Sequence, residues 1–345
     1  MKPKSLLYIL TLLLVTYSGY WVYLSQNAES QVKTLTTSLE KKSIFLTYDG
    51  IETSGFPYRL IINFKNPEFI LREGFINLSW KGGALDAFFQ PWNLTHMIFT
   101  GNGGEINFGK EKDKAHSKSI IPESFRASFI TAKGAEQRLS IEILNGVYSN
   151  GLSPSQNPSL MIESINLHGR LNDSITAEGS NLLEPKIGDL SLTLRDIKKP
   201  GFQTLGTPNE FQISMTPRGI RMPTFTKEGL GEWRNQGSTV DINGFSLNWR
   251  KGTVTGSGSL TLDEAFRPLG VISGEYKTPT DIIEFLSLAG FITSTEGPRI
   301  TMGLKTMSSL FKKKQGQKTP FSISAQGGGL WLGSLKFKSI EPVLN

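Results

Sequence analysis

Cysteine is absent from all 345 residues of the sequence. The chain therefore has no disulfide framework, no thiolate nucleophile and no cysteine-based metal site. Histidine is scarce, with three residues, and none lies at metal-ligand spacing from another or from a pair of carboxylates. Charged residues account for 19% of the chain, a little below the globular norm. We accordingly expect no metal and no cofactor.

The chain is nevertheless long and apolar enough to fold around a core. Hydrophobic residues make up 38% of the sequence, which suffices for one large or two modest domains. Glycine is abundant at 36 residues and predicts many turns. The net charge of +7 suits nucleic acid, anionic lipid or simple solubility, and the N-terminal segment helps to decide between them.

The first segment has the length and composition of a membrane-spanning helix. No charged residue occurs between Ser5 and Ala28, and the core of this run is Leu6 to Leu24. As a helix this core reaches about 28 Å, close to the roughly 30 Å hydrocarbon thickness of a bilayer. Aromatic residues crowd its far end, as in an interfacial belt: Tyr17, Tyr20, Trp21 and Tyr23.

Two lysines, Lys2 and Lys4, precede the run and argue for a cytoplasmic N-terminus. The alternative is a cleaved signal peptide, whose apolar region is usually about 7–15 residues long and is followed by a small-x-small site. Here the run is longer, and Gln26 stands where a small residue is wanted before Ala28, so we favour an uncleaved anchor over residues 1–28. In either case the rest of the chain is exported, and we expect no nucleic-acid partner.

Beyond the anchor, the sequence predicts a short polar connecting helix over 29–42 and a β-rich body over 43–345. Apolar residues recur at every second position in stretches such as Leu60–Phe64. Many pieces of strand length, separated by Gly, Pro, Asn or Asp, argue for antiparallel pairing. Long loops place a soft internal boundary near 150–200.

Helices return near the C-terminus. Thr278 is a predicted N-cap, Pro279 is the first helical residue and Gly290 is the stop. Between them, four apolar residues share one helical face: Ile282, Phe285, Leu286 and Ala289. A second helix is predicted to begin at Pro298.

In the preceding segment, Asn243-Gly244 and Lys251-Gly252 predict hairpin turns. The expected fold class is mainly β (α+β). It has an N-terminal transmembrane helix, then an extended, curved antiparallel β-sheet body with one or two covering helices near the C-terminus.

Two glycine clusters, Gly101–Gly104 and Gly256–Gly258, invite a phosphate-loop interpretation. Neither has the complete G-x-G-x-x-G pattern or the G-K-[ST] ending, and the second lies in a strand pattern rather than before a helix. We therefore expect these glycines to allow close backbone approach or bending of the sheet.

Basic residues offer two candidate anion contacts. Arg59 follows the stiff Gly55-Phe56-Pro57 corner, which we expect to direct Phe56 to the core and to begin a strand at Tyr58. Arg59 either binds an anion or lies on the solvated face of the strand, and we favour the solvated position. Three C-terminal lysines either contact anionic lipid or belong to a solvated loop: Lys312, Lys313 and Lys314.

An exported hydrolase would need His96, His116 or His168 to meet a serine and a carboxylate in a cleft. No G-x-S-x-G elbow occurs in the sequence. We expect His96 in the core or an interface, His116 in a charged loop and His168 on a strand. We expect no enzyme activity, and the hydrolase is kept as a minor alternative.

Two groups of motif residues stand out in the body. The first lies in and just after the stretch GFPYRLIINFKNP: Gly55, Phe56, Pro57, Tyr58, Arg59, Asn66, Pro67 and Trp80. The second lies in the last third of the chain: Trp233, Gly256, Gly258, Leu262, Arg267, Pro268 and Gly270. Together with the GGGLWLG ending, both groups resemble a bacterial family catalogued as domain of unknown function 2125. The lysine-rich composition departs from the usual members, and we expect the motif residues to be mainly structural.

The resemblance implies a membrane-anchored envelope protein without a known enzyme activity. The Gly-x-Gly, Pro-Leu-Gly and helix layout is also loosely similar to AsmA-like envelope proteins, whose long β-sheets with a hydrophobic groove are associated with lipid transport between membranes. We expect a single-pass inner-membrane protein with most of its chain in the periplasm. Its expected role is to act as a binding or scaffold protein of the envelope, with lipid held in an apolar groove of the curved sheet. The alternative is a structural subunit of an envelope complex, which recognises protein alone through an apolar surface patch.

Overall fold

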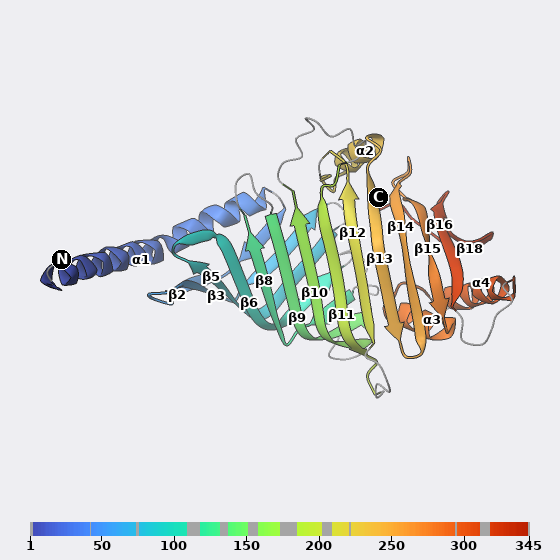
Figure 1. The fold of residues 1–345 in the computed structure, drawn as a ribbon, viewed down its shortest axis with the longest axis horizontal. Helices are drawn as coiled ribbons and strands as arrows, with labels where there is room; N and C mark the ends of the chain where they lie inside the picture. The colour runs from blue at the N-terminus through green and yellow to red at the C-terminus, as the bar shows by residue number, and fades with distance from the viewer. Residues whose placement is uncertain are drawn as a thin grey trace.

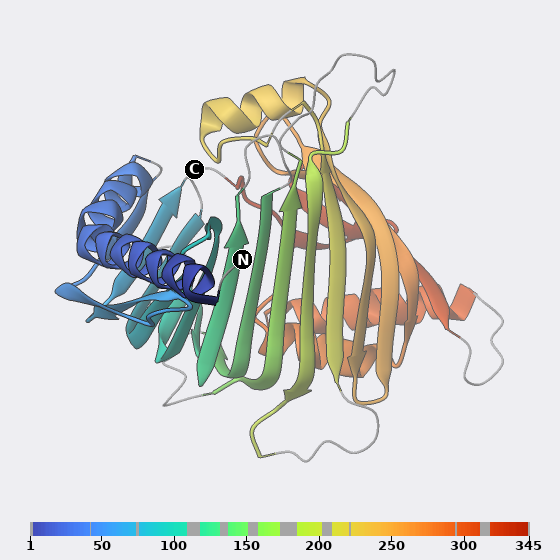
Figure 2. The same ribbon diagram turned by 60° about the vertical axis from the view of Figure 1, so that its left-hand side comes forward.

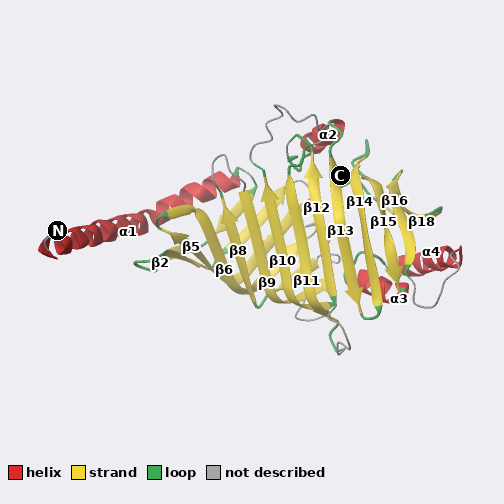
Figure 3. Cartoon of the chain, in the orientation of Figure 1, coloured by secondary structure: helices red, strands yellow, loops and turns green. Residues whose placement is uncertain are grey.

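The computed structural model describes residues 3–41, 43–73, 76–108, 118–131, 137–150, 158–172, 185–201, 209–220, 222–293, 295–310 and 318–343. Within these ranges, one long N-terminal helix leads into an antiparallel sheet of 18 strands, to which three shorter helices are attached (Figure 1). Figure 3 shows how far strands dominate the body. The expected mainly β fold is confirmed.

The sheet is a meander over most of its length. From β9 onward each strand pairs with the next one, whereas the long strands β5 and β6 each pair with two shorter strands along one edge. The strands are β1 Ile44–Thr47, β2 Gly50–Ser54, β3 Leu60–Lys65, β4 Glu68–Glu73, β5 Ile76–Gln90, β6 Asn93–Phe108, β7 Lys118–Ile121, β8 Ser124–Ile130, β9 Gln137–Asn150, β10 Leu160–Leu171, β11 Gly188–Lys198, β12 Glu210–Arg218, β13 Thr239–Trp249, β14 Gly252–Leu262, β15 Pro268–Lys277, β16 Thr319–Gln326, β17 Gly329–Leu332 and β18 Leu335–Ser339.

The sheet has one apolar face and one polar face, because side chains alternate along every strand. In β11, for example, Leu192 and Leu194 point to the apolar side and Thr193 points to the opposite side. Figure 2 shows that the sheet is bent. We call the concave, apolar face of strands β9–β16 the trough.

The helices α2 Lys227–Asn235, α3 Pro279–Leu288 and α4 Glu296–Leu310 cover the two ends of the trough. In Figure 2, α2 lies at one end of the strands, and α3 and α4 lie at the other. Helix α3 begins and stops where the sequence predicts, with Gly290 at φ +70° just after its C-cap. The side chain of Thr278 makes no capping hydrogen bond, because this residue adopts a left-handed conformation.

The largest core cluster joins α3 to the sheet. Trp249 at the end of β13 is 1% exposed and Phe285 of α3 is 4% exposed, and their ring centroids are 5.5 Å apart. Leu160, Ile162 and other apolar residues of the trough complete the cluster. The core therefore lies at the end of the trough that α3 covers.

Helix α1 runs without a break from Pro3 to Glu40, so the expected anchor and connecting helix form one continuous element. Its first part is exposed, with Leu6 at 61%, and the helix is long and apolar enough to cross a membrane. Its second part packs against the first strands of the sheet and buries Ala28 and Val32.

The structure corrects several local predictions. Strand β3 begins at Leu60 rather than at Tyr58, which lies in a turn. Asn243-Gly244 is not a hairpin turn but a bulge inside β13, between Ile242 and Phe245, because both neighbouring strands continue past it. Helix α2 was not predicted, although Thr226 caps it by accepting a hydrogen bond from the amide of Gly229. Strands on either side of residues 150 and 200 pair directly, and the division into 1–28, 29–42 and 43–345 with a soft boundary near 150–200 stays a prediction.

We predict that Phe285→Ala lowers the free energy of unfolding by about 3–5 kcal/mol, because it leaves a cavity between α3 and Trp249. Phe291→Ala is the matched control, since Phe291 is 59% exposed, and it should cost less than about 1 kcal/mol. Urea unfolding of the full chain in detergent micelles, followed by circular dichroism, measures both. Equal costs for the two variants would contradict this position of the core.

Candidate functional site

The trough carries rows of apolar residues across neighbouring strands, and glycines stand at two positions of the second row. One row runs from β9 to β15: Ile143, Ile165, Leu194, Phe211, Leu247, Val254 and Tyr276. A second row, nearer α2, runs from β9 to β16: Leu139, Gly169, Leu190, Met215, Ile242, Gly258, Ile272 and Ile323. Most of these side chains are only half-buried, so they form a surface rather than a filled core.

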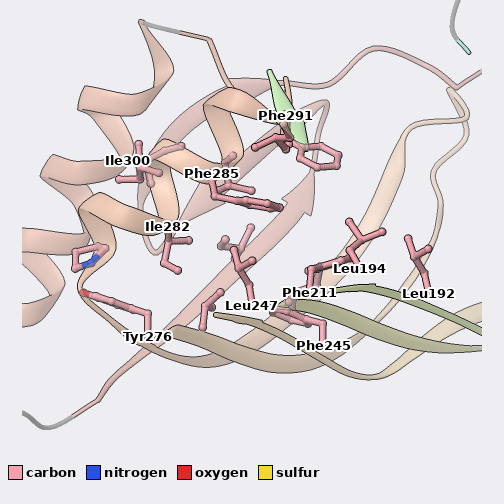
Figure 4. Close-up of a pocket in the computed structure, with 18 of the residues that line it drawn as sticks. Leu192, Leu194, Phe211, Phe245, Leu247, Tyr276, Ile282, Phe285, Phe291 and Ile300 are labelled. Atoms are coloured by element: carbon pink, nitrogen blue, oxygen red, sulfur yellow. The ribbon is translucent and has the colours of Figure 1, made fainter. Parts of the chain in front are cut away.

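A cavity of about 560 Å³ lies between this surface and the helices α3 and α4. Figure 4 shows side chains from the strands and from the helices facing one another across it. Leu192, Phe211 and Phe245 come from the sheet, and Ile282 and Ile300 come from the helices. The cavity is therefore lined almost entirely by apolar groups, and we call it the α3 cavity.

Lys118 is the one charged residue among the described residues that line the α3 cavity. Its Nζ lies 3.5 Å from the carbonyl oxygen of Gly290 and 5.2 Å from the centre of the Phe291 ring. Burial lowers the pKa of Lys118, and the positive charge of Lys338 lowers it further. Lys118 thus lies at the edge of an apolar cavity, with a carbonyl group and an aromatic ring as its neighbours and with a second cation nearby, since Lys338 Nζ donates to the carbonyl oxygen of Phe291 at 2.7 Å.

The wall of the α3 cavity beside Lys118 is held in place by a buried hydrogen bond. The hydroxyl of Tyr148 on β9 donates to the carbonyl oxygen of Ala289 at the end of α3, at 2.9 Å. Burial raises the pKa of Tyr148 to about 12, so this side chain stays neutral at physiological pH. The bond ties α3 to the sheet.

A second cavity of about 560 Å³ lies at the other end of the trough, under α2. Three motif residues meet around it: Leu262 of β14 and Pro268 of β15, which pair across the turn between these strands, and Trp233 of α2. Its rim is more polar than that of the α3 cavity, because Arg170 and Asp189 also line it.

Asp189 is the centre of a small charged cluster on this rim. Its Oδ2 lies 2.7 Å from Arg170 Nη2 and 2.7 Å from Lys186 Nζ, and its Oδ1 accepts a hydrogen bond of 3.1 Å from the hydroxyl of Thr216. Burial alone would raise the pKa of Asp189, but these hydrogen bonds outweigh it and lower the pKa to about 2. The cluster holds β10, β11 and β12 together at the rim.

The motif glycines lie where another strand leaves no room for a side chain. A Cβ on Gly256 would collide with the ring of Phe245, and one on Gly258 would collide with the backbone of β15. Gly270 adopts a φ of +153° against the backbone of Ser259. These contacts fit the expected role in close strand approach.

Arg267 closes the β14–β15 turn. Its Nε lies 2.8 Å from Asp263 Oδ2, and its backbone amide donates to Asp263 Oδ1 at 2.9 Å. Burial acts to raise the pKa of Asp263, but the hydrogen bonds from Arg267 outweigh it and lower that pKa. The contact is a structural clasp between the two ends of a turn.

The first motif group lies where α1 meets the sheet. Phe56 does not enter the core as expected: it is 53% exposed, and its ring lies edge-on against Trp21 of α1, with centroids 5.4 Å apart. Gly55 adopts a φ of +99° and packs against Arg59 and Ile61. The corner is turned outward because α1, rather than the inside of the sheet, supplies its packing partner.

Other residues of this group form turns and local cores. Trp80 is 5% exposed and donates from Nε1 to the carbonyl oxygen of Gly103 at 3.2 Å, so the Gly101–Gly104 cluster makes room for an indole ring. Asn66 adopts a left-handed φ of +48° and donates to Asp49, and Pro67 beside it is buried. None of these contacts has the form of a catalytic site.

Of the three predicted anchor residues, one is exposed and two are packed against the sheet. Leu6 is exposed, whereas Trp21 and Leu24 pack against the core between α1 and the sheet. The candidate lipid contacts Lys312, Lys313 and Lys314 lie outside the described residues, as does His116.

The two described histidines each contact a serine on a neighbouring strand. His96 Nε2 lies 2.9 Å from Ser128 Oγ, and His168 Nδ1 lies 3.1 Å from Ser140 Oγ. Within the described ranges neither histidine bonds to a carboxylate, and no cluster of metal-ligating side chains occurs there. The absence of enzyme activity stays a prediction.

Neither Lys118 nor Asp189 was predicted from the sequence to be a site residue. A signal for Lys118 exists, since it stands two residues before Ile120 on a short strand and so shares the apolar face of that strand. Asp189 has no such signal, because its partners Arg170, Lys186 and Thr216 come from separate segments.

We predict that wild-type protein loses more stability than Asp189→Asn when the pH falls from about 4 to about 2. The pKa of Asp189 is lowered in the folded state, so its stabilising contribution is present above the unfolded pKa of about 3.9 and is lost as the pH approaches the folded value. Urea midpoints of both proteins across this range give the difference. Parallel pH profiles would show that the cluster does not stabilise the folded state.

Comparison with known proteins supplies one match. Residues 21–339 match a family described as "Uncharacterized protein conserved in bacteria (DUF2125)". No curated protein matches the chain, and no solved structure does, so the looser resemblance to AsmA-like proteins stays a prediction. Because the match covers the whole sheet and all of the motif residues named above, the chain belongs to the bacterial family DUF2125.

Proposed function

We propose that this protein is a membrane-anchored lipid-binding protein of the bacterial envelope, and that the trough holds the acyl chain of a lipid. The observation that carries the proposal is the α3 cavity, which offers about 560 Å³ of space lined almost entirely by apolar side chains. Ligand pockets usually enclose about 300–1,000 Å³, and each methylene group that leaves water contributes about 0.8 kcal/mol.

The shape of the site suits a chain rather than a compact ligand. The apolar rows of the trough lie side by side, so apolar residues follow one another along the strands from the α3 cavity toward the cavity under α2, as Leu194, Leu192 and Leu190 do along β11. An acyl chain needs no hydrogen-bond partners along its length, and the lining residues supply almost none. A polar metabolite would lose its hydration without compensation.

Lys118 supports an acidic ligand. Its ammonium group is half-buried at the edge of the α3 cavity, and within the described residues no carboxylate is paired with it. A carboxylate or phosphate group on the ligand would provide the missing counter-charge through a charge-assisted hydrogen bond. We therefore propose an anionic amphiphile, with its head beside Lys118 and its chain in the cavity.

The proposed location follows from α1. The helix has the length and composition of a single-pass anchor, and Lys2 and Lys4 before it favour a cytoplasmic N-terminus. The sheet would then lie on the periplasmic side of the inner membrane. A structural subunit that binds protein instead of lipid is the alternative outcome of the experiments below.

We predict that Leu192→Trp reduces lipid binding several-fold, because the larger side chain fills the α3 cavity. The matched control is Thr193→Trp, which places the same ring on the outer face of the same strand. The full chain in nanodiscs is incubated with a photoactivatable fatty acid, and labelled peptides are identified by mass spectrometry. The photoactivatable fatty acid should label wild type and the Thr193→Trp control on β11 to β13. The proposed ligand would be overturned if Leu192→Trp were labelled as strongly as wild type, or if wild type were not labelled at all.

We also predict that Lys118→Met weakens binding of a long-chain carboxylic acid by about tenfold, since a hydrogen bond to a charged group contributes about 1.5–3 kcal/mol. Binding of the corresponding long-chain alcohol should stay unchanged. Lys277→Met, at an exposed position on β15, is the control that removes the same charge elsewhere. Fluorescence titration in nanodiscs measures the binding of both ligands to wild type and to each variant. An equal loss of acid and alcohol binding in Lys118→Met would exclude a specific contact with the head group.

A further inference from the structure

The exit of α1 from the body is fixed by three aromatic side chains. Tyr20 donates from its hydroxyl to the carbonyl oxygen of Pro91 at 2.9 Å, and Trp21 donates from Nε1 to the carbonyl oxygen of Arg59 at 3.0 Å. One turn of helix earlier, the hydroxyl of Tyr17 donates to the carbonyl oxygen of Pro57. The helix is therefore bound to two turns of the sheet, Gly55–Arg59 and Pro91–Trp92, rather than connected to it by a loose linker.

These contacts fall within the apolar run of α1, not after it. Tyr17 lies about 17 Å and Trp21 about 23 Å along the helix axis from Leu6, whereas a bilayer needs about 30 Å of apolar helix. If the run from Leu6 to Leu24 spans the membrane, the two turns lie at the depth of its last third. The turns then cannot stand clear of the bilayer, and they must enter its interfacial region.

The exposed side chains of the two turns match that environment. Phe56 is 53% exposed, Tyr58 75% and Trp92 63%, and Leu94 beside them is 47% exposed. Aromatic rings with a polar edge are the residues that favour the membrane–water interface. If the turns stood in water, these side chains would be exposed to it, because within the described residues no helix or strand covers them.

A basic hollow lies between the same two turns. It encloses about 520 Å³, and Arg59 and Arg126 line it together with Tyr58, Trp92 and His96. None of the described residues that line it is acidic. Arg126 stands opposite Glu142 of β9 in the strand register, but within the described residues neither arginine makes an ion pair with a carboxylate. Guanidinium groups bind phosphate oxygens in a bidentate fashion.

We infer that the turns Gly55–Arg59 and Pro91–Trp92 form a membrane-docking surface, in which the aromatic side chains enter the headgroup region and the two arginines bind the phosphates of anionic lipids. The inference rests on the proposed anchoring by α1. It assigns the first motif group, which includes Gly55 to Arg59, a role in setting how deep the sheet lies in the bilayer.

The docking surface also orients the trough. Figure 1 shows β2, β3 and β5 beside the point where the free part of α1 leaves the body, and the later strands at increasing distance from it. With the two turns in the interface, successive strands of the trough would stand progressively farther from the membrane. A lipid held beside Lys118 would then be raised above the bilayer surface.

The absence of cysteine allows a direct test by single-cysteine spin labelling of the full chain in liposomes. Tyr58→Cys and Trp92→Cys probe the docking surface, Leu14→Cys probes the anchor, and Ser273→Cys on the exposed outer face of β15 is the aqueous control. We expect oxygen to relax the labels at 14, 58 and 92 more than a water-soluble nickel chelate does, and the reverse at 273.

The outcomes separate the two proposals. If Leu14 is in lipid while the labels at 58 and 92 behave like the control, the anchor stands and the docking surface is wrong. If the label at Leu14 is accessible to the nickel chelate, the anchor is wrong and the docking surface falls with it.

The phosphate contact has its own measurement. Arg59→Gln and Arg126→Gln should each lower the preference of the protein for spin-labelled phosphatidylglycerol over phosphatidylcholine by about fivefold, the effect expected of one cation at an anionic surface. Lys277→Gln, at an exposed position far along the sheet, is the control and should leave the preference unchanged. An unaltered preference in both arginine variants would overturn the assignment of phosphate binding.

Discussion

The alternation of side chains along a β-strand is the constraint on which this structure depends. It places the apolar residues of β9 to β16 on one face of the sheet, and an apolar face of that extent has to be covered. The described helices α2, α3 and α4 cover its two ends, and a cavity lies at each end beside the side chains that pack the helices on the sheet. The same constraint that folds the sheet therefore also creates its most distinctive surface.

The two ends of the trough differ in chemistry. At the α3 end, the cavity is apolar except for Lys118, and a buried bond from Tyr148 to the end of α3 holds its wall. At the α2 end, the cluster around Asp189 places charges on the rim. If the trough holds an amphiphile, as proposed, this difference between its ends would give the ligand a preferred direction. The hydrogen bonds from α1 to the turns at 55–59 and 91–92 fix how the trough lies relative to the helix.

Particular elements show how far local sequence patterns reach. Pro279 and Gly290 mark the ends of α3 because their backbone preferences act within a few residues. Asn243-Gly244 has the same local preference for a turn, yet it forms a bulge, because strands on both sides of β13 continue past it. Phe56 was expected in the core, and only the position of α1 explains why it faces outward.

By itself, the sequence determined the mainly β fold, the apolar helix before it and the structural character of the motif glycines, because each depends on the period of the pattern or on the backbone of single residues. The family could be named for the same reason, from residues grouped along the chain. The tertiary structure alone decided that Trp233, Leu262 and Pro268 share a cavity, that Lys118 is the cation of the other cavity, and that three aromatic residues of α1 hold the turns at 55–59 and 91–92. Apart from the pair of Leu262 and Pro268, those contacts join residues that are tens to more than a hundred positions apart. Which pairs meet depends on the bend of the whole sheet, which no local pattern encodes.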